Sequence, residues 1–387
     1  MSIQAIVERC EALYEDVELA AVRAWKERTQ GKAVGYLPAY VPREILHACG
    51  VLPVGILGGG DQVEIVRGDA CFQSYICHLP RSVLELALSG KLDVLDGMLF
   101  PSTCDVIRNL SGIWKLRFPG KLARYVDVPQ NFDPAVGGVF YRRLLEDLID
   151  DLAELSGHRP SDDDLRASIG AYQTNRALVE ELYRLRAQAP WRVPTSEAYL
   201  LLRAGMLLPV EEHSALLRDY LAEVEREERR EQDNARIVLR GSFCEQPPLT
   251  LVRTLERAGC YVVDDDFMPI LRWGVGRPSD AGDALDALVR AWLESESELP
   301  SRFAADGQPK GARLVEKTRR SGAEGVLLAA PNFCDPALLE RPMLQEALAE
   351  AEIPCTAFLY AENTGQLQPI REQAGTFADS LKLWGEA

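Results

Sequence analysis

Two stretches of alternating strand-like and helix-like segments constrain the fold of this chain more than any other feature. In the first, apolar strands near residues 51–57 and at "VLDGMLFP" are each followed by helical patterns such as "DVIRNLSGIWKL". The second begins at "ARIVLRG" and repeats the alternation through "CYVVDDD" and "AEGVLLAAP". Strands that alternate with helices form parallel sheets, so each stretch predicts an α/β lobe of the Rossmann-like kind.

The segment between these stretches shows helical periodicity almost throughout. The predicted organisation is an N-terminal helix with the first α/β lobe (1–138), a helical block (139–234) and the second α/β lobe (235–387). Residues 3–30 are expected to form one amphipathic helix. The charge run at 223–233 is expected to be the solvated face of a helix.

Charge and hydropathy narrow the class of protein. The chain has 43 Lys and Arg residues and 59 Asp and Glu residues, which gives a net charge of −16. Such a negative chain would repel a phosphate backbone, so nucleic acid is disfavoured as a partner. No uncharged apolar run reaches the ~18 residues of a membrane-spanning helix. The N-terminal residues are interrupted by acidic side chains and make a poor signal peptide. A cytoplasmic protein with no membrane partner is expected.

Familiar nucleotide and hydrolase motifs are absent. The sequence has no G-x-x-x-x-G-K-[ST] phosphate loop, no G-x-G-x-x-G after a strand and no G-x-S-x-G. The chain is therefore not expected to hydrolyse a nucleotide by itself. The four histidines are scattered, and no C-x-x-C occurs, which disfavours zinc ribbons, thioredoxin chemistry and sequence-local ferredoxin sites.

Three of the nine cysteines share one local context. The sequence "PSTCD" at 101–105 follows an apolar strand and precedes a helix, and "PNFCD" at 331–335 does the same in the second lobe. Cys77, in "CHLPRS", also lies just before a helix, which Pro80 is expected to open. Asp105 and Asp335 are the expected N-caps of their helices. Ligands of open α/β sheets gather at this position, beyond the carboxyl ends of the strands.

Cysteines in this position are candidate ligands of iron. A thiol beside a helix N-terminus is biased toward thiolate, the form that binds iron or zinc, although a capping aspartate offsets part of the effect. Three thiolates from two lobes would suit a cubane iron–sulfur cluster in the cleft between them. The alternative is that Cys77, Cys104 and Cys334 fill small spaces at the strand ends. The acidic run at 264–266 could orient a substrate or a proton donor, or could cap or solvate a strand end.

The same motifs carry a resemblance to a known family. The segments "GYLPAYVPREILHACGVLPVGILGGG", "CHLPRS", "FPSTCD", "NFCDP" and "GQLQPIREQAGTFADS" resemble the benzoyl-CoA reductase / 2-hydroxyacyl-CoA dehydratase family. The resemblance extends from about residue 35 to residue 383, and the three cysteine motifs occur in order with matching flanks. It implies that Cys77, Cys104 and Cys334 hold a [4Fe-4S] cluster.

The resemblance also implies a reaction and partners. The expected activity is the ATP-dependent reduction of an aromatic acyl-CoA, benzoyl-CoA, to a cyclic dienoyl-CoA, with the thioester carbonyl accepting the first electron. The implied partners are a paralogous dehydratase-like subunit, ATP-hydrolysing activator-type subunits and ferredoxin. This division of labour agrees with the missing phosphate loop.

Several alternatives stay open at the level of sequence. Cys71 and Cys244 are additional candidate ligands, because some relatives hold a double-cubane [8Fe-9S] cluster that needs more thiolates. The chain could instead be a subunit of a radical 2-hydroxyacyl-CoA dehydratase. It could also be a non-catalytic partner that carries a cluster while its paralogue binds the substrate. No catalytic residue is assigned.

Overall fold

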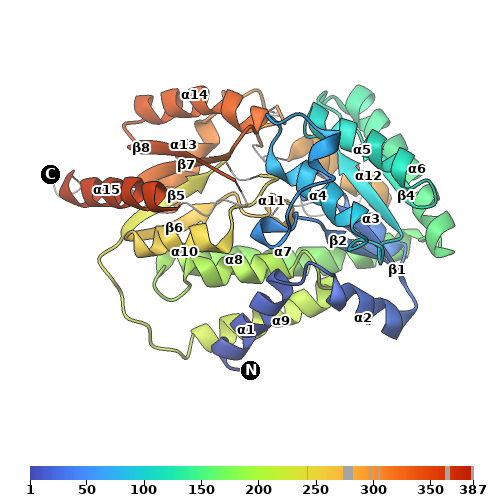
Figure 1. The fold of residues 1–387 in the computed structure, drawn as a ribbon, viewed down its shortest axis with the longest axis horizontal. Coiled ribbons are helices and arrows are strands. Elements are labelled where there is room, and N and C mark those ends of the chain that lie inside the picture. Colours follow the sequence, from blue (N-terminus) through green and yellow to red (C-terminus); the bar gives the residue numbers. More distant parts are fainter. Residues whose placement is uncertain (242, 273–281, 296–298, 304–305, 362–366, 385–387) are drawn as a thin grey trace.

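The protein folds into two α/β lobes that rest on a layer of helices (Figure 1). The structure is a computed structural model and describes residues 1–241, 243–272, 282–295, 299–303, 306–361 and 367–384. Ser242 and the "GQ" that opens the last quoted family segment lie outside the described residues. Each lobe contains a sheet of four parallel strands, as the alternating pattern predicts.

The two sheets have the same topology. The first has the order β2-β1-β3-β4, and its strands are β1 (Lys32–Tyr36), β2 (Val51–Gly55), β3 (Gly97–Pro101) and β4 (Leu122–Val126). The second has the order β6-β5-β7-β8, and its strands are β5 (Ala235–Arg240), β6 (Cys260–Asp265), β7 (Gly325–Pro331) and β8 (Cys355–Tyr360). The strand order reverses between β1 and β3 and again between β5 and β7, and such switch points open a crevice beyond the strand ends.

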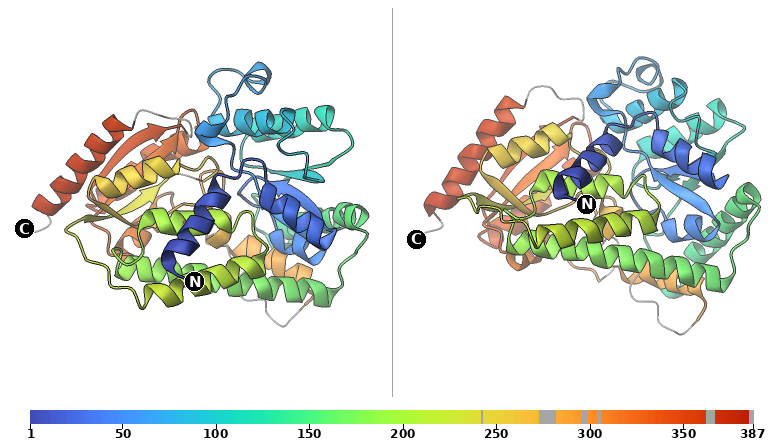
Figure 2. Two further views of the ribbon diagram at one scale, coloured as in Figure 1. Left: turned by 60° about the horizontal axis from the view of Figure 1, so that its bottom comes forward. Right: turned by 90° about the horizontal axis from the view of Figure 1, so that it is seen from below.

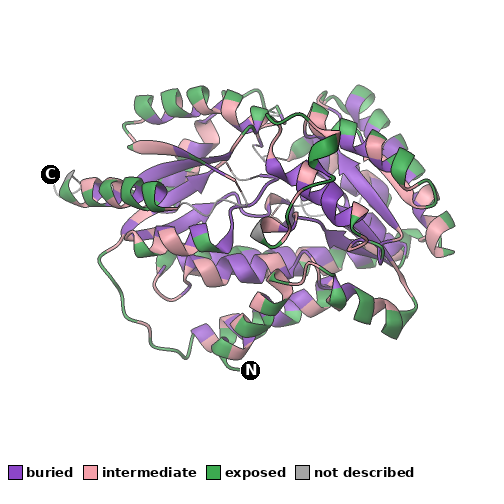
Figure 3. Ribbon diagram, in the orientation of Figure 1, coloured by how far each residue is buried: buried purple, intermediate pink, exposed green. Residues whose placement is uncertain are grey.

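Each lobe also contributes helices of its own. In the first lobe these are α2 (Ala20–Thr29), α3 (Arg43–Ala48), α4 (His78–Leu88) and α5 (Asp105–Arg117), with short 3-10 turns η1 (Gly60–Gln62) and η2 (Asp69–Cys71). In the second lobe they are α10 (Leu249–Arg257), α11 (Pro269–Arg272), α13 (Ala312–Arg320), α14 (Asp335–Glu350) and α15 (Gln368–Trp384). Figure 3 shows the inner strands buried and the outward sides of α14 and α15 exposed, and the edge strands β4 and β8 are mostly half-buried.

The helical layer joins the lobes. It consists of the π-turn η3 (Pro134–Gly138), α6 (Val139–Ser156), α7 (Asp162–Gln188), α8 (Thr195–Ala204) and α9 (Val210–Val224), and it packs against α1 (Ile3–Tyr14). A capping box between Ser161 and Asp164 starts α7. At 27 residues, about 40 Å long, α7 contacts α3 of the first lobe and β6 of the second (Figure 2). Helix α12 (Ala284–Glu294) returns from the second half of the chain to pack on α6 and α7.

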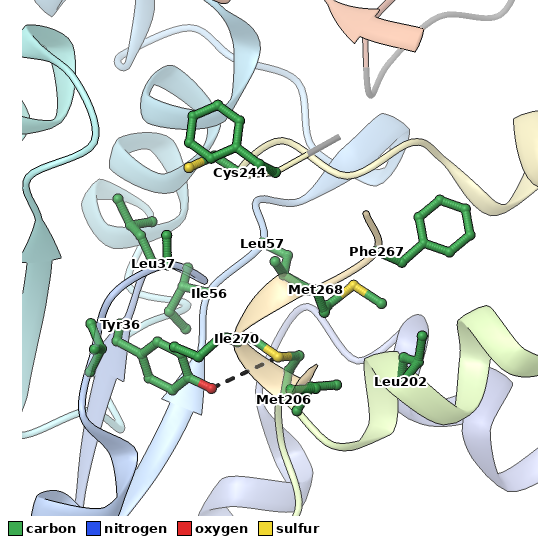
Figure 4. Packing of buried hydrophobic residues seen from close by; sticks show 14 of the residues in the cluster. Tyr36, Leu37, Ile56, Leu57, Leu202, Met206, Cys244, Phe267, Met268 and Ile270 are labelled. Atoms are coloured by element: carbon green, nitrogen blue, oxygen red, sulfur yellow. Dashed lines mark hydrogen bonds between the residues drawn. The ribbon is translucent and has the colours of Figure 1, made fainter. Parts of the chain in front are cut away.

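One hydrophobic core extends through both lobes. It includes Val34 and Leu99 of the first sheet, Leu201 of α8, and Ile237 and Leu327 of the second sheet. Figure 4 shows part of this core, where the first-lobe residues around Tyr36 meet Met206 and Met268. The hydroxyl of Tyr36 donates to the sulfur of Met206 at 3.8 Å. Because the lobes share a core, their relative position is fixed by packing.

Two predictions of local structure are wrong. The first helix does not run from residue 3 to residue 30: α1 ends at Tyr14 and α2 starts after Leu19, which has a left-handed backbone with φ 52°. Asp16 accepts hydrogen bonds from the amides of Ala20 and Ala21 and so starts a second helix. The charge run at 223–233 is exposed but not helical, because α9 ends at Val224.

The short strand β1 was not anticipated, because its five residues, "KAVGY", carry little alternation. Its position is set by neighbours on both sides, since Tyr36 pairs with Gly55 of β2 and with Leu99 of β3. None of the helices in the described residues is long and apolar enough to cross a membrane.

Candidate functional site: four thiols between the lobes

Three of the predicted site cysteines are themselves the N-caps of helices. Cys77 precedes α4, Cys104 precedes α5 and Cys334 precedes α14. Helices α5 and α14 thus start one residue earlier than predicted, so Asp105 and Asp335 are first-turn residues rather than caps, and α4 starts two residues before Pro80. None of the three cysteine side chains forms a capping hydrogen bond. First-turn amides of α5 and α14 act on Cys104 and Cys334, whereas the amides of His78 and Leu79 in α4 donate to Glu245.

Cys104 and Cys334 occupy equivalent positions in the two lobes. Each follows the central strand beyond the switch point, β3 in the first lobe and β7 in the second. The amide of Ser102 donates to Val126 O at 3.0 Å, and the amide of Asn332 donates to Tyr360 O at 2.6 Å. Both bonds tie the strand-end loop to the last residue of the neighbouring edge strand. The similar motifs "PSTCD" and "PNFCD" thus occupy equivalent places, although Phe333 has a left-handed backbone with φ 60° and the first motif has no such residue.

Cys244 comes from the other side of the switch point in the second lobe. It follows β5, which ends at Arg240. Gly241 has φ +121°, and a Cβ at this residue would lie 2.6 Å from the carbonyl oxygen of Ala329 in β7. The glycine therefore allows the chain to turn tightly against β7. This turn leads to the buried Cys244.

The four cysteines lie within electrostatic reach of one another. Burial is the main reason that the pKa of Cys334 rises to about 12, and Cys104 is one of the charges that raise it further. The pKa of Cys77 is raised by burial and then by Glu245, Cys334, Cys104 and Cys244. Burial, Cys334 and Cys104 likewise raise the pKa of Cys244. The crevice thus brings together thiols from both lobes.

The expected bias toward thiolate is not found, because burial outweighs the helix N-termini. The amides of Ile107 and Val106 oppose the increase in the pKa of Cys104, and the amide of Ala337 does so for Cys334, yet both values remain raised. Charged thiolates would be costly here unless a cation accompanied them.

The surroundings of the thiols fit an iron–sulfur cluster. The Oγ1 atom of Thr103 is buried and makes no hydrogen bond within the described residues, and it lies close enough to Cys104 and Cys244 to lower the pKa of both. The hydroxyl of Thr103 and several first-turn amides could donate hydrogen bonds to the sulfur atoms of a cluster. The donor set, made of thiols from separate segments, is the soft kind that such clusters select.

The thiols do not form a ready site for a single ion. Among the residues that the structure describes, no group of three Cys, His, Asp or Glu side chains converges closely enough to hold a metal ion.

The remaining cysteines lie apart from these four. Cys71 is half-buried in η2, in the segment that precedes α4 and projects from the molecule (Figure 2). It is not among the groups with the largest effects on the four thiols. Cys260 starts β6, at the opposite end from the crevice, and its Sγ lies 3.9 Å from Ala374 O. Of the two less certain candidates, Cys244 lies within electrostatic reach of Cys77, Cys104 and Cys334.

The acidic run at the end of β6 is held in buried ion pairs. Asp265 receives hydrogen bonds from Arg186 at 2.5 Å and Tyr183 at 2.6 Å. Arg272 lies 2.6 Å from Asp264, and Arg240 lies 3.2 Å from Asp266. These cations hold the pKa of Asp264 and Asp266 below the usual range although burial acts in the opposite direction. The run therefore neither solvates a strand end nor presents a free carboxylate.

Sequence reasoning missed Glu245. Its side chain is buried, and its Oε2 accepts hydrogen bonds from the amides of His78 and Leu79 at 3.0 and 3.3 Å. The signal in the sequence was its position beside Cys244, in "FCEQPP", where an acidic residue lies within an apolar and proline-rich context.

Comparison with known proteins places the chain in a family. The family model described as "2-hydroxyglutaryl-CoA dehydratase, D-component" matches residues 38–381. One of the subunits of the benzoyl-CoA reductase of Thauera aromatica is 54% identical over 385 residues, which is 99% of this chain and 100% of the relative. The beta subunit of (R)-2-hydroxyglutaryl-CoA dehydratase of Acidaminococcus fermentans is 26% identical over 98% of this chain and 100% of its own length.

A third relative has a similar relation to the chain. The beta subunit of lactoyl-CoA dehydratase of Anaerotignum propionicum is 26% identical over 93% of this chain and 95% of its own length. The identity to the reductase subunit is thus about twice the identity to the dehydratase subunits. The family match agrees with the resemblance seen in the sequence. The chain belongs to the 2-hydroxyglutaryl-CoA dehydratase D-component family, which includes a subunit of benzoyl-CoA reductase.

Proposed function

We propose that this chain is an iron–sulfur subunit of an ATP-dependent benzoyl-CoA reductase, which converts benzoyl-CoA to a cyclic dienoyl-CoA with electrons from ferredoxin. The observation that carries the proposal is the gathering of Cys77, Cys104, Cys244 and Cys334 between the lobes, in a chain 54% identical to a benzoyl-CoA reductase subunit along its length. The reaction adds two electrons and two protons to the ring.

Cys77, Cys104 and Cys334 would hold the cluster, because each lies directly before a helix and thiols are the soft ligands that iron–sulfur clusters select. At Cys104 and Cys334 the first-turn amides can also offset part of the charge of a thiolate. Cys244 would be a fourth ligand, or a thiol that closes the site. When bound, the cluster supplies single electrons at low potential. We expect a [4Fe-4S] cluster, since the structure gathers four thiols. The double-cubane [8Fe-9S] alternative would also require Cys71.

The chain's own residues shield part of this site from water, although Cys77 and Cys104 are only half-buried. Cys244, Cys334 and Thr103 are buried, and the shared core closes the crevice from the side of the helical layer. A low-dielectric, dry environment matters for radical chemistry, because water would quench a reactive intermediate.

The proposed partners follow from what the sequence lacks. The chain has no phosphate loop, so we assign ATP hydrolysis to separate activator-type subunits that receive electrons from ferredoxin. A paralogous dehydratase-like subunit would complete the enzyme. We infer that the complex works in the reducing cytoplasm, where all nine thiols can remain free, as they are in the structure.

Iron analysis tests the cofactor. The full-length chain, purified without oxygen, is expected to contain about four iron atoms, or about eight for the double-cubane alternative, with matching acid-labile sulfide. A well-folded preparation without iron or sulfide would overturn the proposal.

Counting electrons distinguishes reduction from dehydration. The complex with its partners should consume two electrons for each dienoyl-CoA formed and should stop when ATP is withheld. A radical 2-hydroxyacyl-CoA dehydratase would need only catalytic electrons, so product in large excess over electrons would favour that alternative. Substrate bound only to the paralogue would favour the role of a non-catalytic, cluster-carrying partner.

A further inference from the structure

The segment from Cys244 to Pro248 is fixed at three successive residues. The hydroxyl of Tyr360, at the end of β8, donates to Glu245 O at 2.6 Å. The amide of Met268 donates to Gln246 Oε1 at 3.1 Å, and the hydroxyl of Tyr199 in α8 donates to Pro247 O at 2.6 Å. Because these donors come from separate elements of the second half and the helical layer, the backbone beside Cys244 has little freedom to move.

From this fixed segment the Glu245 side chain reaches into the first lobe. Its Oε2 accepts the amide hydrogens of His78 and Leu79, the first two residues of α4. Cys77 is the N-cap of α4 but forms no capping hydrogen bond. Glu245 therefore performs the capping that the cysteine does not, and it does so from the other lobe. An anionic carboxylate is stabilised at a helix N-terminus by the free amides and the helix dipole.

The same carboxylate lies beside the thiols. It accepts the amide hydrogens of the two residues that directly follow Cys77, and it belongs to the residue that directly follows Cys244. Glu245 is only 2% exposed, so water screens its charge little. An electron added to a cluster at this place would be repelled by the carboxylate, and nearby net charge is one determinant of the potential of such clusters.

We propose that Glu245 is a positioning residue that holds Cys77 of the first lobe in register with the thiols of the second, and that its negative charge makes the cluster harder to reduce. This inference rests on the proposed function, because it assumes a cluster at the four thiols. It assigns two separable effects to one side chain: the hydrogen bonds position the ligand, and the charge lowers the potential.

Two substitutions separate these effects. Glu245→Gln keeps an oxygen that can accept the two amide hydrogens but removes the charge. Glu245→Ala removes both. The matched control is Glu85→Gln, because Glu85 is also buried and its Oε2 accepts hydrogen bonds from the amides of Val66, Arg67 and Gly68. Glu85 lies seven residues farther along α4, roughly 10 Å from its first residue.

The first measurement is the midpoint potential of the full-length chain, purified without oxygen and titrated with a strong one-electron reductant while the reduced cluster is followed by electron paramagnetic resonance. Glu245→Gln should keep its iron and shift the potential upward, with reduction favoured at least tenfold, which is ~59 mV for a one-electron couple. Glu85→Gln should leave the potential unchanged. A Glu245→Gln protein with full iron and an unchanged potential would overturn the proposed effect of the charge.

The second measurement needs no iron. Hydrogen exchange at the amides of His78 and Leu79 should be at least tenfold faster in Glu245→Ala than in the unchanged protein, and nearly unchanged in Glu245→Gln. Equal protection in all three proteins would overturn the positioning role. Absence of iron in the unchanged protein would overturn the proposed function and the effect on potential, while the exchange result would still decide whether Glu245 holds Cys77.

Discussion

The two lobes have the same strand order but differ in the residues that follow some of their equivalent strands. In both, a central strand ends in a loop that leads to a cysteine and then to a helix, at Cys104 and at Cys334. On the opposite side of the switch point the lobes differ: β5 leads to Cys244, whereas β1 leads to Tyr40, which has φ +58° and is fully buried. Topology thus determines where a ligand can bind, and the residues of the loops determine which ligand.

A second difference lies at the ends of β2 and β6, which are equivalent edge strands. Beyond β2 the chain continues with the buried apolar residues Ile56 and Leu57. The end of β6 instead carries three buried aspartates paired with arginine and lysine side chains. The first lobe is therefore stabilised there by apolar packing and the second by buried ion pairs, whose loss is costly when only one partner is removed.

The largest expected effect concerns the equivalence of the two strand-end cysteines. Cys104→Ser and Cys334→Ser should each abolish or convert the cluster, because a hard hydroxyl replaces a soft thiolate. Iron and sulfide analysis of anaerobically purified protein measures this. Cys355→Ser is the control, because Cys355 starts β8, at the opposite end from the crevice. Loss of iron from only one of the two variants would show that the lobes are not equivalent as ligand donors.

The next largest effect is expected on stability, when one of the ion pairs that distinguish the second lobe is broken. Asp265→Ala leaves Arg186 buried without its carboxylate and removes the acceptor of Tyr183. We expect a loss of about 3–5 kcal/mol in the free energy of unfolding, measured by chemical denaturation. The comparison is Ile56→Val at the apolar end of β2, for which about 0.5–1.5 kcal/mol is expected. Similar losses for both variants would remove the distinction between the lobes.

A smaller effect is expected from glycines near the two switch points. Gly241→Ala should destabilise the fold by about 1–3 kcal/mol, because alanine rarely adopts φ +121° and its Cβ would meet the backbone of β7. Gly35→Ala in β1 should cost less, about 1 kcal/mol, because its Cβ would meet the flexible side chain of Met98. Thermal unfolding of both variants provides the measurement, and a larger loss for Gly35→Ala would contradict this ranking.

The sequence predicted the parallel lobes, the helical layer and the context of Cys77, Cys104 and Cys334, because these depend on local patterns. Strand–helix alternation and a cysteine before a helix are visible within a few residues. It did not predict β1, whose place is set by pairing with β2 and β3, which lie far from it in the chain. It also missed Glu245, whose role depends on α4 of the other lobe.

The ion pairs of the aspartate run could not be predicted for the same reason. Arg186 belongs to α7, Arg240 to β5 and Lys317 to α13, and only the fold brings them to the end of β6. From the sequence alone the run looked solvated or catalytic. Long-range contacts, and not local propensity, decide how such charges are used.

The distribution of the four thiols along the chain has a consequence for how the protein is made. Cys77 and Cys104 lie in the first lobe, but Cys244 and Cys334 come from the second, beyond the whole helical layer. A ribosome would have to complete β7 and the start of α14 before the last of these thiols leaves the exit tunnel. Folding of the first lobe during synthesis could therefore produce only half of the site. The cluster proposed for these thiols would therefore be assembled only late in the maturation of this protein, after the second lobe has been made.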